Sequence, residues 1–293
     1  MSHPPYQAVI LAAGRGSRLG DLTKSTPKAL LPLGPRSVAD ARETTFLERQ
    51  CRLLSTAGVA KIVVVIGHDA ERVAREVRAW ELDVHLVRNP TPDMAISGSL
   101  HSFQFAARAG LGVLDGSHQT LLLDADIVYD RGALARLLDA PPVSAILVSR
   151  LYAEDAEEVR VYGDPDRPRF IGKGMTPVII GGAPCLGEAT GIVKYAPQDH
   201  GWARATMDWI LGDPDAPAGS LARAGFGPAR RGTEHEELAQ CLMNLGRMRS
   251  VSFGAESIFM EVDTADEYRR MRERVYPRLL QLEASGDGRD TYS

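Results

Sequence analysis

Glycines and basic side chains gather in one short stretch near the N-terminus. The segment LAAGRGSRLG, residues 11–20, is followed closely by TPKAL, residues 26–30. Glycine lets a backbone turn sharply and bring its N–H groups close to an anion. Four positive charges accompany the glycines, from Arg15, Arg18, Lys24 and Lys28. This combination predicts a loop that binds a triphosphate.

Two better-known phosphate loops do not fit this segment. A Walker A loop needs glycine, four residues and then Gly-Lys-Ser or Gly-Lys-Thr, which the segment lacks. A dinucleotide fingerprint needs G-x-G-x-x-G, but Leu19 stands where the third glycine belongs and Gly20 comes one position late. The late glycine disfavours an NAD-dependent oxidoreductase.

Acidic residues follow two segments with the pattern of buried strands. Asp124 and Asp126 come after the run TLLL, and Asp263 follows SIFMEV, with Glu261 two positions before it. Open α/β sheets bind ligands at the carboxyl ends of their strands. Mg²⁺ prefers oxygen ligands and often takes one or two carboxylates together with substrate phosphates. Asp124, Asp126 and Asp263 are therefore candidate magnesium ligands.

The full pattern LAAGRGSRL with TPKALLPL resembles the signature of the nucleotidyltransferase superfamily with the GT-A-like fold. Its members include sugar-1-phosphate nucleotidylyltransferases, molybdopterin cytidylyltransferases and CTP:phosphocholine cytidylyltransferases. The resemblance implies that the glycine loop wraps the triphosphate and that Arg18 and Lys28 neutralise its charge. The nucleotide-binding residues that we expect in the loop are Leu11, Ala13, Gly14, Arg15 and Gly16.

The resemblance extends to the acidic segments. DADIVY looks like the DAD-type motif of phosphocholine cytidylyltransferases, and ESIFMEVDTADEYRRM looks like their C-terminal segment. It implies that Asp126 and Asp263 form the magnesium pair and that Asp124 supports the nucleotide. A polar segment, N-P followed by S-G-S-L, resembles the base-recognition segment of cytidylyltransferases. It implies that Ser97, Gly98 and Ser99 read cytosine, and a helix N-cap there is compatible with that role.

The second half of the chain is expected to bind the acceptor. Lys173, in a Gly-Lys-Gly turn typical of a hairpin, is a candidate phosphate or phosphonate ligand, and Glu188 and Glu236 are further candidates. Trp202 and Trp209 lie seven positions apart, on one helical face, which favours the core over a pocket for a cationic head group. An aminoethyl or carboxy phosphonate is therefore as reasonable an acceptor as phosphocholine.

Alternating strand and helix signals surround these motifs in the first half. Continuous apolar runs at residues 6–12, 61–66, 84–87, 120–123 and 145–149 are typical of strands buried on both faces. Helical spacing at residues 45–57, 70–80, 99–109 and 132–138 separates them. The rhythm predicts an α/β fold with a doubly wound, mostly parallel, Rossmann-like sheet.

The regular alternation of predicted strands and helices ends at about residue 150. We expect short strands at residues 159–162, 169–171 and 178–180, helices at 202–211 and 234–245, a strand at 258–262 and a closing helix at 264–282. Thr264 and Glu267 have the spacing of a capping box. One nucleotidyltransferase domain would span residues 1–283, with a nucleotide-binding half (6–150), a smaller acceptor-binding β/α region (151–257) and a closing strand and helix (258–283). Residues 213–232 read as a mobile loop and 284–293 as a flexible tail.

The composition of the chain excludes some classes of function and of site. The chain has 293 residues, a formal net charge of −4 and three scattered cysteines. The acidic balance disfavours broad nucleic-acid binding, and the cysteines predict neither disulfides nor zinc. We read no signal peptide and no membrane segment, so a cytoplasmic protein is expected, with a homodimer possible.

These features predict a magnesium-dependent cytidylyltransferase. It would transfer CMP from CTP to a small phosphomonoester or phosphonate, of the phosphocholine, aminoethylphosphonate or carboxyphosphonate type, and release pyrophosphate. Two alternatives stay open: a sugar-1-phosphate nucleotidylyltransferase that uses UTP or another nucleotide, and a non-catalytic nucleotide-binding sensor.

Overall fold

The computed structural model describes residues 5–91, 97–152, 158–212 and 233–285. Its centre is a nine-stranded sheet in which most neighbours come from distant parts of the chain. The strands are β1 (Tyr6–Ala12), β4 (Lys61–Ile66), β5 (Val84–Arg88), β6 (Gln119–Asp124), β8 (Ala145–Ser149), β9 (Arg160–Asp164), β10 (Arg167–Gly172), β11 (Cys185–Tyr195) and β12 (Arg249–Phe253).

The sheet has a parallel part and an antiparallel part. β6, β1, β4 and β5 lie side by side and run in one direction, and β12 runs parallel to β8. The long strand β11 joins the two parts, because it pairs antiparallel with β6, β8 and β9. β9 and β10 form an antiparallel hairpin at the far edge. The expected mostly parallel α/β sheet is confirmed, with the antiparallel strands confined to the second half.

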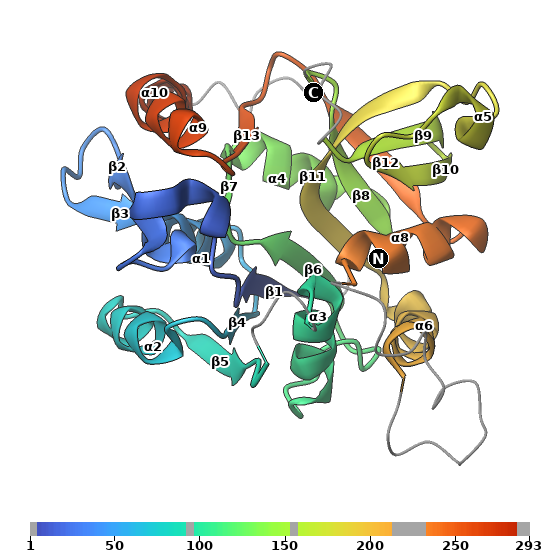
Figure 1. Ribbon diagram of the computed structural model, residues 1–293, viewed down its shortest axis with the longest axis horizontal. Coiled ribbons are helices and arrows are strands. Elements are labelled where there is room, and N and C mark those ends of the chain that lie inside the picture. The colour runs from blue at the N-terminus through green and yellow to red at the C-terminus, as the bar shows by residue number, and fades with distance from the viewer. Residues whose placement is uncertain (1–4, 92–96, 153–157, 213–232, 286–293) are drawn as a thin grey trace.

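Helices cover both faces of this sheet (Figure 1). Ala8 and Ile10 of β1 pack toward α1 (Phe46–Thr56), α2 (Ala70–Ala79) and α4 (Arg131–Asp139). Val9 packs toward α3 (Ser99–Arg108), α6 (His200–Leu211) and α8 (His235–Asn244). Successive side chains of a strand point to opposite faces, so one continuous apolar run supplies both layers.

The C-terminal segment packs beside the glycine loop (Figure 1). β13 (Phe259–Glu261) pairs antiparallel with β7 (Ile127–Tyr129), which follows β6. After β13 the chain enters α9 (Ala265–Arg270), a π-helical turn (Met271–Val275) and α10 (Tyr276–Ser285). A short hairpin of β2 (Pro32–Pro35) and β3 (Glu43–Thr45) lies on the same side. The pairing of β13 with β7 places the residues that follow β6 close to those that follow β13.

Several expectations for the second half were wrong. Residues 178–180 belong to the short helix α5 (Pro177–Ile180), which has proline at its first position and ends at Gly181 in the left-handed conformation. β12 was not anticipated, and Glu188 lies within the long strand β11. Residues 284 and 285 end α10, whereas the rest of the expected tail and the expected loop at 213–232 lie outside the described residues.

No helix within the described ranges is both long enough and apolar enough to cross a membrane.

The predicted capping box at the start of α9 is present and can be tested. Thr264 Oγ1 accepts from the backbone N–H of Glu267, and Glu267 Oε2 accepts from the backbone N–H of Thr264 at 2.8 Å. We predict that Thr264→Ala lowers the free energy of unfolding by about 1 kcal/mol, because a backbone donor loses its partner. Thr264→Ser keeps the hydroxyl and should lose much less. Urea unfolding of the wild type and both variants measures these losses of unfolding free energy. Equal losses in both variants would contradict the capping role.

Candidate active site

One large cavity of about 1010 Å³ opens at the carboxyl ends of β6 and β13. Residues remote in sequence meet on its walls. Those expected from sequence to bind nucleotide, metal or acceptor are Arg18, Ser99, Asp124, Asp126, Lys173, Glu188, Glu236 and Asp263. The fold therefore brings the predicted nucleotide side and the predicted acceptor side into a single cavity.

The two predicted magnesium ligands share one ammonium group. Lys28 Nζ lies 2.6 Å from Asp126 Oδ2 and 2.8 Å from Asp263 Oδ1. Arg18 Nη2 lies 2.9 Å from the same oxygen of Asp263. Burial opposes the charged form of Lys28, but Asp126 and Asp263 outweigh it and raise the pKa of Lys28. Burial likewise opposes ionisation of Asp263, yet Lys28 and Arg18 lower its pKa, so Lys28 and Asp263 are both held in their charged forms.

A third carboxylate completes this cluster. Oxygen atoms of Asp126, Glu261 and Asp263 lie within 4.8 Å of one another. Three carboxylates so close repel each other unless a cation lies among them, and the ammonium of Lys28 shows that the geometry accepts one. Hard oxygen donors at this spacing fit Mg²⁺. The sequence placed Glu261 two positions before Asp263 on β13 but gave no reason to include it in the site.

The glycine loop lies directly beside this cluster. Gly14 and Arg15 are exposed, and Gly16 has a positive φ of 68°. A Cβ atom on Gly16 would lie 2.7 Å from Cβ of Lys28, so only glycine lets the lysine pass over the loop. Leu11 pairs within the sheet, and the carbonyl of Ala13 accepts from His68 N at 3.0 Å. Lys24 is exposed and paired with Asp21, so it differs from Lys28 in its surroundings.

The expected base-reading segment is held by contacts within the chain. Ser97 Oγ accepts a hydrogen bond from Asn89 at 2.9 Å. Gly98 N donates to His101 Nδ1 at 3.2 Å, and Ser99 Oγ donates to Glu234 Oε2 at 2.5 Å. Ser99 also begins α3, so the expected coincidence of a helix start with this segment is observed. The assignment of these residues to cytosine stays a prediction.

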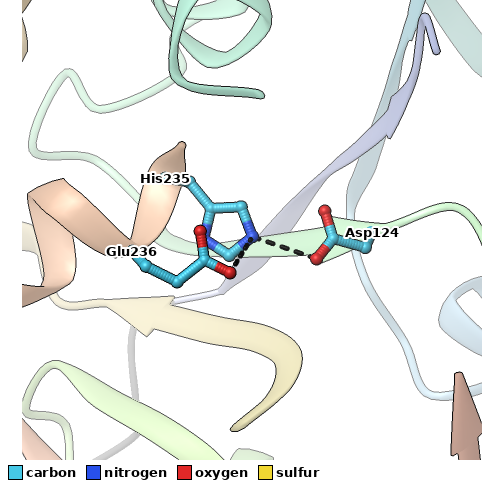
Figure 2. Close-up of side chains that lie close together, drawn as sticks. All are labelled: Asp124, His235 and Glu236. Carbon is cyan, nitrogen blue, oxygen red and sulfur yellow. Dashed lines mark hydrogen bonds and ion pairs between the residues drawn. The ribbon is translucent and has the colours of Figure 1, made fainter. Parts of the chain in front are cut away.

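Asp124 belongs to a second cluster, which sequence reasoning missed. His235, at the start of α8, places Nε2 3.0 Å from Asp124 Oδ2 and 3.8 Å from Glu236 Oε1 (Figure 2). Burial raises the pKa of Asp124 to about 6 against the opposing effect of His235. Burial alone would lower the pKa of His235, but Glu236 and Asp124 raise it to about 10. A buried imidazolium therefore balances the acid at the end of β6.

The cavity is rich in acids. Seven glutamates line it, together with fewer basic residues: Glu158, Glu188, Glu234, Glu236, Glu237, Glu261 and Glu267. Lys173 is exposed in a bend after β10 and not in a hairpin turn as expected, because the helix α5 follows in place of a second strand. The preference for core tryptophans was also wrong, because Trp202 and Trp209 are 48% and 42% exposed. Trp209 lines the cavity, and Trp202 packs under the guanidinium of Arg247.

Comparison with known proteins agrees with this arrangement. Residues 8–188 match the model of the MobA-like NTP transferase domain, and this match spans more than half of the chain. The chain belongs to this family. The expected membership of the nucleotidyltransferase superfamily is thereby confirmed.

Relatives of this MobA-like transferase include cytidylyltransferases. It is 36% identical over 149 residues to CMP-5'-(3-aminopropyl)phosphonate synthase of Streptomyces rubellomurinus, covering 50% of this chain and 21% of that protein. It is 27% identical over 147 residues to CTP:phosphoglutamine cytidylyltransferase of Campylobacter jejuni, covering 50% of this chain and 54% of that one. The chain thus spans a fifth to about half the length of these two relatives.

Solved structures share the fold of this MobA-like transferase. The inositol-1-phosphate CTP transferase of T. maritima has a TM-score of 0.64 at 16% identity, covering 94% of this chain and 99% of that one. CTP:phosphocholine cytidylyltransferase of Streptococcus pneumoniae also has a TM-score of 0.64, at 19% identity, covering 92% and 98%.

Glu188 gives the transferase a pH-dependent stability. Burial and the nearby Glu158 raise its pKa from 4.5 to about 7. The folded state therefore binds more protons than the unfolded state between these values, and stability falls as pH rises through that window. We predict that Glu188→Gln is more stable than the wild type at pH 8, by on the order of 1 kcal/mol, with a smaller difference at pH 5. Urea unfolding at both pH values tests this, and a pH-independent difference would contradict it.

Proposed function

We propose that this MobA-like transferase transfers CMP from CTP to a small phosphonate or phosphomonoester and releases pyrophosphate. The observation that carries the proposal is the cluster of Lys28, Asp126 and Asp263 beside the glycine loop, whose two carboxylates line the large cavity. A nucleotidyl transfer needs cationic groups for the triphosphate and a carboxylate pair for a divalent cation in one place. The names of two relatives, a CMP-5'-(3-aminopropyl)phosphonate synthase and a CTP:phosphoglutamine cytidylyltransferase, support cytidine as the base.

The acceptor oxygen needs no general base in this reaction. A phosphate or phosphonate oxygen is already anionic at neutral pH and attacks the α-phosphorus of CTP in line. The bond to the bridging oxygen breaks as the new bond forms, and pyrophosphate leaves with the charge. Catalysis then rests on positioning and charge neutralisation. Arg18 and Lys28, next to the glycine loop, would neutralise the leaving pyrophosphate, and Lys173 would hold the acceptor.

Asp126 and Asp263 would hold Mg²⁺, with Glu261 in reach. When bound, the ion supplies positive charge that offsets the charge of the phosphates. The triphosphate offers the ammonium of Lys28 a competing anionic partner, so Lys28 can neutralise phosphate oxygens once a divalent cation satisfies the two acids.

The charge of the cavity favours an acceptor with a protonated amine. Seven glutamates line it, together with Trp209. A cation gains from nearby carboxylates and from an aromatic ring, whereas a second carboxylate on the acceptor would be repelled. The name of the Streptomyces rubellomurinus relative, an aminopropylphosphonate synthase, agrees with this choice.

A pyrophosphate-release screen tests the proposed function. CTP, UTP, GTP, ATP and dTTP would each be offered with aminoalkyl phosphonates, phosphocholine, phosphonoformate and sugar 1-phosphates, with Mg²⁺ present. We expect release with CTP and a small phosphonate or phosphomonoester. Release only with UTP or dTTP and a sugar phosphate would replace the proposal by a sugar nucleotidylyltransferase. Nucleotide binding without release from any pair would indicate a sensor.

We predict that the same screen separates acceptors by charge. At equal concentrations, aminoethyl- and aminopropylphosphonate should give a kcat/KM at least about tenfold above that of phosphonoformate, because tenfold corresponds to about 1.4 kcal/mol, less than one well-placed ion pair in a partly buried site. Methylphosphonate, which carries neither charge, is the control and should fall between them. A preference for phosphonoformate would contradict the amine assignment while leaving nucleotidyl transfer intact.

Asp126 tests the metal assignment. We predict that Asp126→Ala lowers kcat at least about 100-fold, as loss of one electrostatic group commonly does, with the fold retained in circular dichroism. The matched control is Asp21→Ala, since Asp21 is also paired with a lysine of the loop but is exposed. It should turn over like the wild type. Wild-type turnover in Asp126→Ala would reject the role of this carboxylate.

A further inference from the structure

The residues that lead into α8, from Thr233 to His235, contact both the expected base segment and the end of β6. The backbone N–H of Leu100 donates to the carbonyl of Thr233 at 3.1 Å. Gly98 packs so closely on Thr233 that a Cβ atom there would lie 2.2 Å from that carbonyl oxygen. This close approach excludes any larger residue at position 98. Gly98 therefore serves the contact with α8 as well as any contact with a base.

Ser99 is held from two sides by this same turn of chain. Its hydroxyl donates to Glu234 Oε2 at 2.5 Å and accepts from the backbone N–H of His235 at 2.8 Å. The backbone N–H of Ser99 also donates to Glu234 Oε2, at 3.3 Å. The hydroxyl thus donates one hydrogen bond and accepts one, and its position depends on where residue 235 lies.

The side chain of His235 reaches in the opposite direction. It is buried, and its Nε2 meets Asp124 Oδ2 at 3.0 Å (Figure 2). Its Nδ1 has no hydrogen-bond partner within the described part of the chain, so the ring is oriented by the contacts of Nε2. Asp124 stands two residues before Asp126, whose carboxylate faces Lys28. The contact with His235 keeps the carboxylate of Asp124 in a cluster separate from that of Asp126.

We propose that His235 is a positioning residue for the nucleotide: its side chain fixes the carboxylate of Asp124 while its backbone fixes Ser99. One residue then sets the distance between the base segment and the acid at the end of β6. Because α8 also carries Glu236, Glu237 and Gln240 into the cavity, the acceptor side moves together with the nucleotide side. The inference deepens the proposed function and rests on Asp124 and Ser99 contacting the nucleotide.

Calorimetric titration with CTP and Mg²⁺, without acceptor, tests the side-chain part of this role. His235→Leu keeps a buried side chain but cannot donate to Asp124, and we expect CTP binding at least tenfold weaker. His235→Gln retains an N–H donor and should recover much of that loss. In the Asp124→Asn background, His235→Leu should weaken binding less than twofold further, because the carboxylate it orients is already gone.

His200→Leu is the matched control. His200 is equally buried, accepts from Gly116 N at 2.9 Å and lies near the opposite end of β6. Its replacement should lower the unfolding midpoint and leave CTP affinity within twofold. Three results would overturn the inference: unchanged CTP affinity in His235→Leu, the same fold loss with and without Asp124→Asn, or an equal loss in His200→Leu. A wild type that binds no nucleoside triphosphate would instead overturn the proposed function and the inference with it.

Discussion

An ammonium group between two carboxylates ties together the three segments that form the candidate site. Lys28 is separated by 98 residues from Asp126 and by 235 residues from Asp263. Its side chain is only 10% exposed, so each of these charges depends on the others for solvation. A partly buried charge without a partner is strongly unfavourable, whereas a balanced group of two acids, Lys28 and Arg18 is tolerated. The site therefore forms only when β6, β13 and the glycine loop have all found their places.

Tight backbone packing lets the lysine reach that position. The side chain of Lys28 crosses Gly16, where any Cβ atom would collide with it. The left-handed conformation at Gly16 adds a second reason for glycine. The same residue that opens the loop to a phosphate thus also admits the side chain that would neutralise the phosphate. This double constraint explains why glycines and basic residues occur together in the segment.

Local patterns predicted the first half well, because its signals arise within single elements. The bounds of β1 and β4, the start of α3 and the capping box at Thr264 all follow from residues close in sequence. The sequence also joined Asp126 to Asp263, although only through a family resemblance.

Local signals failed where exposure or distant contacts decide the structure. Residues 178–180 are β-branched but largely exposed, so Pro177 and Gly181 set a helical turn instead. The spacing of Trp202 and Trp209 gave one helical face, yet the buried face of α6 is that of Ala203, Met207 and Ile210. His235 and Glu261 join the site by packing alone, and no local pattern indicates that.

The distribution of charge in the cavity resolves a difficulty shared by both proposed substrates. CTP and a phosphonate are both anions, so a uniformly basic cavity would attract each to the place of the other. Here Arg18 and Lys28 lie at the glycine loop, whereas Glu158, Glu188, Glu236 and Glu237, all from the expected acceptor-binding region, line the cavity. A triphosphate carries no positive charge and is repelled by these glutamates, while an aminophosphonate can place its phosphonate toward the cations and its amine toward the acids. The buried contact of His235 with Asp124 offsets the negative charge of one acid at the end of β6. The positions of a few fixed charges in the cavity can therefore orient CTP and the phosphonate, although both are anions.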